Sequence, residues 1–335
     1  MNRTSRRLKR VYLLILFLFT LAMLSTTTYA WFTSNRIVTV NTINVHVAAS
    51  GGIEISADGT NWKSIITPED ITSVHATTYP TSVNQIPYSL EPVSSGLEVD
   101  PATGLLKIYY GLTDNNTLGD YIITSTRSVE TEGNGATNNG KFIVFDLFFK
   151  VSSDTQLYLT SNSKVTYLNT EQGKGIANAT RIVFVNEGTV PTGSDLATIQ
   201  GLRNANNNTV YSWEPNYDIH TQAAVNHAYN LYGIITQTEN GNRIIYDGIT
   251  NDIAKTDNVL LRNAKATYFP TKFKTVMIDY YTKNDFTANV PVFTLESGIT
   301  KMRIYMWIEG QDVDCENDAS YDDIQFDLQL TVNPS

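Results

Sequence analysis

The sequence has little of what covalent cross-links and most catalytic sites require. Of its 335 residues, one is cysteine and four are histidine. The single cysteine, Cys315, excludes an intrachain disulfide framework and a cysteine-rich zinc module. Charged residues make up 17% of the chain, below the roughly one quarter found in typical soluble domains. The formal charge of −9 disfavours nucleic acid as a partner, because a phosphate backbone attracts basic surfaces.

The motifs of common enzymes and metal sites are also missing. There is no His-Glu-x-x-His pair, Gly-x-Ser-x-Gly elbow, Walker loop or dinucleotide fingerprint. His220 and His227 lie seven residues apart and could share a helix face, but solvated or hydrogen-bonded histidines are the favoured interpretation. Cys315 stands in no nucleophile motif, which favours a structural thiol. We therefore predict no catalytic residues and no bound cofactor, and we expect that the protein is not an enzyme.

What the chain has in abundance suits β-structure. It contains 43 threonines, 31 asparagines, 19 tyrosines and 13 phenylalanines. Threonine, tyrosine and phenylalanine favour strands, while asparagine and glycine favour turns. This composition argues against a helical bundle, and its aromatic content argues against a disordered chain.

The first thirty residues have the three-part layout of an export signal. Five of the first ten residues are basic, and an apolar run of 14 residues follows, Val11–Leu24. A membrane-spanning helix needs about 20 apolar residues, so the run fits a signal peptide better. Thr28 and Ala30 supply the small residues expected before a cleavage site. The alternative is an uncleaved anchor that contacts the membrane through residues 11–32.

Cleavage after residue 30 would leave an acidic protein. The remainder carries 19 basic and 33 acidic residues, a net charge of −14. Such a surface is typical of a soluble protein. We expect it to be extracellular or at the cell surface.

Alternation of apolar and polar residues predicts many short strands. In 142–151 one face is entirely apolar and should point into the core; its members are Ile143, Phe145, Leu147, Phe149 and Val151. The segment 324–332 alternates equally clearly. Further strands are expected at 37–47, 52–57, 105–110, 121–125, 157–160, 165–168, 181–186, 234–238, 244–246, 276–281, 291–295 and 301–309.

These patterns predict an all-β fold, a jelly-roll-like β-sandwich formed as a single domain by residues 31–335. An Asn-rich middle, roughly 187–265, is predicted as an insertion of loops and short helices. Helical periodicity is limited to 221–231 and, more weakly, 195–204. No fixed-period repeat occurs, which argues against a solenoid or propeller.

One acidic segment, 312–323, resembles a calcium loop in its alternating oxygen ligands. Asn317 stands where an EF-hand needs glycine, and strands rather than helices are expected on both sides, so an EF-hand is rejected. A calcium site between strands and a solvated acidic loop both remain open, and the loop is favoured. The candidate metal ligands are Asp312, Asp314, Glu316, Asp318 and Asp323.

Several stretches, taken in order, resemble the TasA/camelysin-like group of exported bacterial surface and biofilm-matrix proteins. They are Thr28–Thr33 (TYAWFT), Phe145–Val151 (FDLFFKV), Leu157–Leu159 (LYL), Ala179–Phe184 (ATRIVF), Trp213–Asn216 (WEPN) and Met306–Cys315 (MWIEGQDVDC). The resemblance implies a jelly-roll sandwich, export with a dedicated signal peptidase, and assembly into extracellular fibres. The chain differs from this pattern in its larger Asn-rich middle. Camelysin carries a protease association, but this chain has no catalytic set to which it could transfer.

The resemblance further implies that a freed N-terminal segment completes the sheet of a neighbouring copy. The matching segment here is about Trp31–Val40, with Trp31, Phe32, Val38 and Val40 as candidate assembly residues. A strand-like segment directly after a cleavage site cannot bury itself alone, and adding it to an exposed sheet edge satisfies both backbones.

Two classes of function therefore stay open. The first is a structural protein that polymerises with itself in a fibre or matrix and contacts other matrix or surface components. The second is a cell-surface adhesin or ligand-binding module that presents aromatics of the middle region, namely Tyr211, Trp213, Tyr217, Tyr229 and Tyr232. Core packing is the favoured interpretation of these aromatics.

Overall fold

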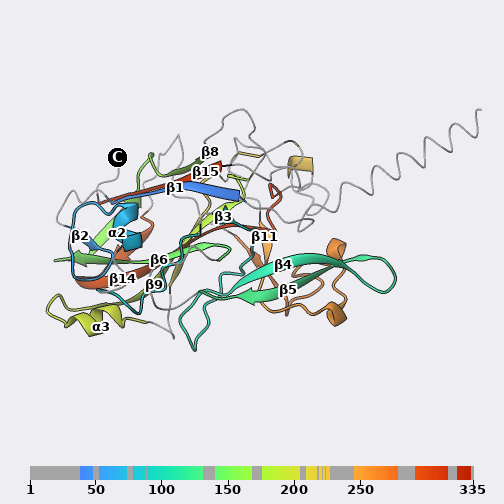
Figure 1. Cartoon of the computed structure of the whole chain (residues 1–335), viewed down its shortest axis with the longest axis horizontal. Helices are drawn as coiled ribbons and strands as arrows, with labels where there is room; N and C mark the ends of the chain where they lie inside the picture. The colour runs from blue at the N-terminus through green and yellow to red at the C-terminus, as the bar shows by residue number, and fades with distance from the viewer. Residues whose placement is uncertain are drawn as a thin grey trace, which may run out of the picture.

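Two β-sheets face each other and bury a common core between them (Figure 1). The arrangement confirms the predicted all-β sandwich. The computed structural model describes residues 38–47, 53–73, 78–87, 89–130, 140–167, 176–203, 209–216, 219–220, 222, 224–226, 245–277, 291–315 and 323–332.

The first sheet has six strands in the order β13-β7-β15-β1-β3, with β8 also paired to β15. These strands are β1 (Val38–Val47), β3 (Ser89–Leu90), β7 (Thr155–Leu159), β8 (Lys164–Tyr167), β13 (Phe293–Leu295) and β15 (Asp323–Thr331). Strand β1 runs parallel to β15, whereas β7 and β8 run antiparallel to it. This parallel pair is an addition to the antiparallel pattern of a jelly roll.

The second sheet has five strands in the order β10-β9-β14-β6-β2. They are β2 (Glu54–Ser56), β6 (Ile143–Val151), β9 (Thr180–Val190), β10 (Val210–Trp213) and β14 (Gly298–Ile308). All 11 residues of β14 are buried, because β6 and β9 flank it and other parts of the chain cover both of its faces.

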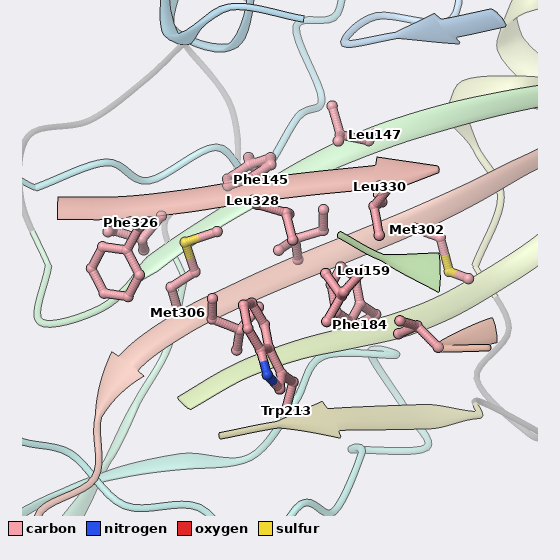
Figure 2. Close-up of a cluster of buried hydrophobic side chains, with 14 of the residues drawn as sticks. Phe145, Leu147, Leu159, Phe184, Trp213, Met302, Met306, Phe326, Leu328 and Leu330 are labelled. Atoms are coloured by element: carbon pink, nitrogen blue, oxygen red, sulfur yellow. The ribbon is translucent and has the colours of Figure 1, made fainter. Parts of the chain in front are cut away.

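The core between the sheets is built from the predicted inward faces. The apolar face of β6 and the alternating residues of β15 lie in one buried cluster; among them are Phe145, Leu147, Phe326, Leu328 and Leu330 (Figure 2). Phe293 of β13 joins the two sheets, with its ring 5.4 Å from that of Phe184 and 5.9 Å from that of Phe149. The assignment of the apolar face of 142–151 to the core is thus confirmed.

The opposite face of the second sheet is covered as well. Phe142 and Val144 lie in a further buried cluster with Tyr305 and Trp307 of the β14 region. A hairpin, β4 (Ile108–Asn115) and β5 (Tyr121–Ser128), and a ladder, β11 (Tyr246–Ile249) and β12 (Phe273–Val276), build a separate small core with Val313. The short helices are α2 (Pro68–Ser73), α3 (Leu196–Gln200), η3 (Lys255–Asp257) and η4 (Leu261–Asn263).

The Asn-rich middle contributes one strand to the sandwich and one to the β11–β12 ladder. Strand β10 pairs with β9 at the edge of the second sheet, and Trp213 reaches the core (Figure 2). Strand β11 instead belongs to the ladder outside the sandwich. The weaker helical pattern at 195–204 contains α3. Most of the stronger one, 221–231, lies outside the described residues.

Residues 1–30, which are predicted to direct export, also lie outside the described residues. None of the helices in the part of the chain that the structure describes is long and apolar enough to span a membrane.

Candidate functional site

The predicted acidic segment leads into a buried ionic cluster rather than a solvated loop. Asp312 and Asp314 follow β14 directly and are both buried, at 3% and 0% exposure. Glu316 and Asp318 lie outside the described residues, and Asp323 begins β15. The expectation of a solvated loop is therefore wrong for Asp312 and Asp314, because each finds a cationic partner inside the protein.

Arg181 is the centre of this cluster. It lies at the start of β9 and is fully buried. Its Nη2 donates to Oδ2 of Asp312 and lies 3.2 Å from Oε1 of Glu214, and its Nη1 donates to the carbonyl oxygen of Thr180 at 2.9 Å. The guanidinium also lies 5.2 Å from the ring centre of Tyr246. A planar guanidinium suits two carboxylates at once, which is the reason for arginine at this position.

A second ion pair extends the cluster. Nδ1 of His220 lies 2.6 Å from Oδ2 of Asp314, and both side chains are buried. Burial alone would lower the pKa of His220, but the hydrogen bond and charge of Asp314 outweigh it and raise that pKa. The prediction of a hydrogen-bonded histidine is confirmed for His220, while His227 lies outside the described residues.

Two glutamates in this region bind protons more tightly than usual. Burial raises the pKa of Glu214 to about 8, although the charge of Arg181 opposes the shift. Burial also raises the pKa of Glu309 to about 7, against the hydrogen bonds that its carboxylate accepts. One of those bonds comes from Nε1 of Trp307 at 3.0 Å. The cause is common to both: a charge without access to water is costly.

A separate buried cluster lies on the outer face of the second sheet. Asp146 of β6 accepts hydrogen bonds from Nε of Arg303 at 2.8 Å and from the hydroxyl of Tyr79 at 2.7 Å. Nζ of Lys301 lies 3.4 Å from the same carboxylate and donates to the carbonyl oxygen of Gln200 at the end of α3. Burial would raise the pKa of Asp146, but Arg303 and Lys301 outweigh it and hold that pKa below its ordinary value.

Sequence reasoning identified Asp312 and Asp314 but missed Arg181, Glu214 and the Asp146 cluster. A usable signal was present, because Asp146 interrupts an otherwise apolar stretch of β6 and two basic residues interrupt β14. Charges on buried strands need partners. The identity of those partners is not local, since Arg181 and Asp312 are 131 residues apart.

Only two of the four candidate assembly residues belong to the part of the chain that the structure describes. Trp31 and Phe32 lie outside the described residues, whereas Val38 and Val40 belong to β1. Val40 pairs with Ile324 of β15, and Val38 pairs with Leu90 of β3. In this single chain, β1 therefore completes the sheet of its own subunit.

The aromatics considered for a binding surface pack inward where the structure describes them. Trp213 is fully buried and lies in the main core. Tyr211 is half-buried with its ring 5.7 Å from that of Phe293. Tyr217, Tyr229 and Tyr232 lie outside the described residues. Core packing is thus confirmed for the two aromatics that can be placed.

The two ionic clusters share one arrangement. Each is an arginine-centred set of ion pairs in which cationic side chains hold the carboxylates. Among the described residues, no three histidine, cysteine, aspartate or glutamate side chains gather as a metal site requires. Cys315 is buried. Comparison with protein-family models, with curated proteins and with solved structures returns no match.

Proposed function

We propose that this chain is a non-enzymatic extracellular structural protein, a subunit of a TasA-like fibre or biofilm matrix that assembles by N-terminal strand addition. The observation that carries the proposal is the parallel pairing of β1 with β15. The first described strand and the last one lie side by side in one sheet (Figure 1). No hairpin turn joins them, so their pairing does not depend on a local connection.

The register supports exchange between copies. Strand β1 pairs with β15 from Thr39↔Asp323 to Val47↔Leu330, with one irregularity between Val40 and Thr42. The β1 of a neighbouring copy has the same sequence and could make the same bonds. Exchange of an identical element is a low-cost route to assembly, and strand addition satisfies the backbone of both partners.

The rest of the molecule fits a structural role. Its buried charges form ion pairs across strands, and its core joins two sheets over most of the described chain. The export layout of residues 1–30 and the resemblance to matrix proteins point in the same direction.

Deletion of residues 31–47, which removes the predicted assembly segment Trp31–Val40 together with the rest of β1, tests the proposal. The truncated mature protein should remain folded and monomeric, because the core residues of β6 and β15 remain, and it should form no fibres by negative-stain microscopy. The single variants Val38→Asp and Val40→Asp should also block assembly, because aspartate disfavours the strand conformation in which these positions pair. Circular dichroism should remain strand-rich in all three.

A complementation experiment separates donation from simple loss of stability. A subunit lacking residues 31–47 should take up a synthetic peptide of these residues and gain thermal stability, whereas a scrambled peptide should have no effect. Polymerisation of the truncated protein would refute donation. If the intact mature protein forms no fibres at any concentration tested, the adhesin or binding module becomes the better proposal.

A further inference from the structure

An open groove lies at the end of the sandwich where β6 turns into β7. Its volume is about 490 Å³, and its lining consists of Asp154, Thr155, Gln156, Tyr158, Thr294 and Val332. Three of these residues come from β7, one precedes it, one lies on β13 and one follows β15. The groove is separate from both ionic clusters and belongs to the edge of the six-stranded sheet.

Strand alternation places the polar lining on the outer face of this sheet. Leu157 and Leu159 of β7 are buried in the core, so Gln156 and Tyr158 point to the other side. Phe293 and Leu295 are likewise buried on β13, which turns Thr294 outward, and Thr294 is the direct cross-strand partner of Gln156. Amide, hydroxyl and aromatic groups therefore share one small surface.

Hydrogen bonds hold two of these groups in place. The hydroxyl of Tyr158 donates to Oε1 of Gln156 at 2.7 Å, a bond that uses the oxygen of the amide and not its two N–H donors. The backbone N–H of Ser297 donates to Oδ1 of Asp154 at 3.0 Å. A carboxylate, an amide and an aromatic ring are thus positioned before any ligand arrives, which lowers the entropic cost of binding.

We propose that this groove binds a neutral sugar unit of a polysaccharide. Adjacent sugar hydroxyls both donate and accept, which matches the carboxylate of Asp154 and the amide of Gln156. The Tyr158 ring offers an apolar surface with a polar tip, as the C–H face of a sugar requires. The lining contains one acidic residue and no basic residue, and the chain carries a net charge of −9, so an anionic polymer is disfavoured.

This inference goes beyond the proposed fibre function and does not depend on it. In the sheet, β15 lies between β7 and β1, so strand exchange at β1 leaves the groove accessible. A fibre whose subunits each carry such a groove would bind polysaccharide at many points along its length. Binding can equally be measured on a protein that does not polymerise.

Affinity electrophoresis of the mature protein tests the groove. Native gels would contain hydroxyethylcellulose, galactomannan or dextran as neutral polymers and polygalacturonate as an anionic one. At least one neutral polymer should retard the protein, and polygalacturonate should not. Tyr158→Ala and Gln156→Ala should each weaken the apparent affinity about tenfold. Tyr268→Ala is the matched control, because Tyr268 is 61% exposed and lies outside the groove.

Further variants separate binding from folding. Gln156 is exposed, so Gln156→Ala should keep the wild-type circular dichroism spectrum and melting temperature. Tyr158→Phe keeps the ring but loses the bond to Gln156, and its affinity should lie between those of wild type and Tyr158→Ala. The proposal is overturned if no neutral polymer retards the protein, if Tyr158→Ala migrates as wild type does, or if polygalacturonate retards it equally.

Discussion

Arg181 and Glu214 lie buried against each other, with 3.2 Å between Nη2 of the arginine and Oε1 of the glutamate. Asp312 contacts the same guanidinium, so one cation lies against two carboxyl groups. Arg181 in β9 thus contacts Glu214, which follows β10, and Asp312 in the loop after β14. Its contribution to stability can be measured directly.

Arg181→Met should destabilise the protein strongly. The variant removes the cation and leaves the carboxylate of Asp312 buried without it, which typically costs about 3–5 kcal/mol. Urea denaturation would measure the loss. Lys255→Met is the matched control, because Lys255 forms a 2.8 Å ion pair with Asp114 but is 57% exposed, and such pairs contribute about 1 kcal/mol or less. Equal losses in the two variants would contradict the role of burial.

Stability should fall as pH rises from mildly acidic to mildly basic. Burial raises the pKa of Glu214 from 4.5 to about 8, so the folded protein holds a proton that the unfolded chain releases. The stability that this proton confers is complete below pH 4.5 and is lost as pH rises to about 8. Glu309, with its pKa raised to about 7, acts with the same sign.

Glu214→Gln checks this pH dependence, because glutamine does not titrate. Urea midpoints measured at several values between about pH 5 and pH 8 should fall less steeply in the variant than in wild type. The control is Glu98→Gln, the same substitution at a side chain that is 37% exposed. An unchanged slope in Glu214→Gln would show that this carboxylate is ionised throughout the range.

Folding should not require calcium. Asp312 and Asp314 already hold Arg181 and His220 as cationic partners, which reduces their attraction for a metal. Thermal melts in chelator and in excess calcium should therefore nearly coincide. Calcium at 100 times the dissociation constant of a native-only site would stabilise by about 2.7 kcal/mol. A calcium-dependent rise of several degrees that disappears in Asp312→Asn with Asp314→Asn would establish a metal site.

Phe293→Ala should cost about 3–5 kcal/mol, because it removes a ring that contacts aromatics of β6, β9 and β10. The surrounding rings come from the opposite sheet and cannot close the cavity without moving a strand. Leu118→Ala is the comparison, since Leu118 is 85% exposed and its truncation should stay within about 0.5 kcal/mol. Differential scanning calorimetry would rank the two.

Gly298→Ala should destabilise β14 at its first residue. The φ angle there is +137°, and an added Cβ would lie 2.4 Å from the carbonyl oxygen of Val190. The strain should cost about 1–3 kcal/mol. Gly193→Ala has no atom within 4 Å of the new Cβ and should be nearly neutral, so chemical denaturation of the two variants isolates the backbone effect. Similar losses would point to a general effect of replacing glycine.

Local patterns predicted the strands well because side-chain alternation reports which face is buried. The segment 142–151 became β6 with its apolar face in the core, and 324–332 became β15. Strand β10 was not predicted, since its four residues carry too short a pattern. The parallel partnership of β1 and β15 was equally out of reach, because strand pairing depends on distant sequence and not on local alternation.

The candidate site was predicted only in part for the same reason. Asp312 and Asp314 stood out as a local acidic pattern, but the pattern suggested solvent or metal as their partner. Their partners are Arg181 and His220, which are distant in sequence. The pairing of β9 with β14 brings Arg181 close to Asp312. The groove at β7 gave no signal either, since threonine, glutamine and tyrosine are ordinary residues on the outer face of a strand.

The parallel pairing of β1 with β15 has a consequence for the order of folding. A chain synthesised from its N-terminus releases β1 long before β15, so β1 must wait for its partner until β15 has emerged. Contacts this distant in sequence form slowly, because a long loop must close first. If the proposed strand exchange occurs, β1 is available during that interval to the β15 of another copy, and the local concentration of copies should decide whether a chain closes on itself or joins another.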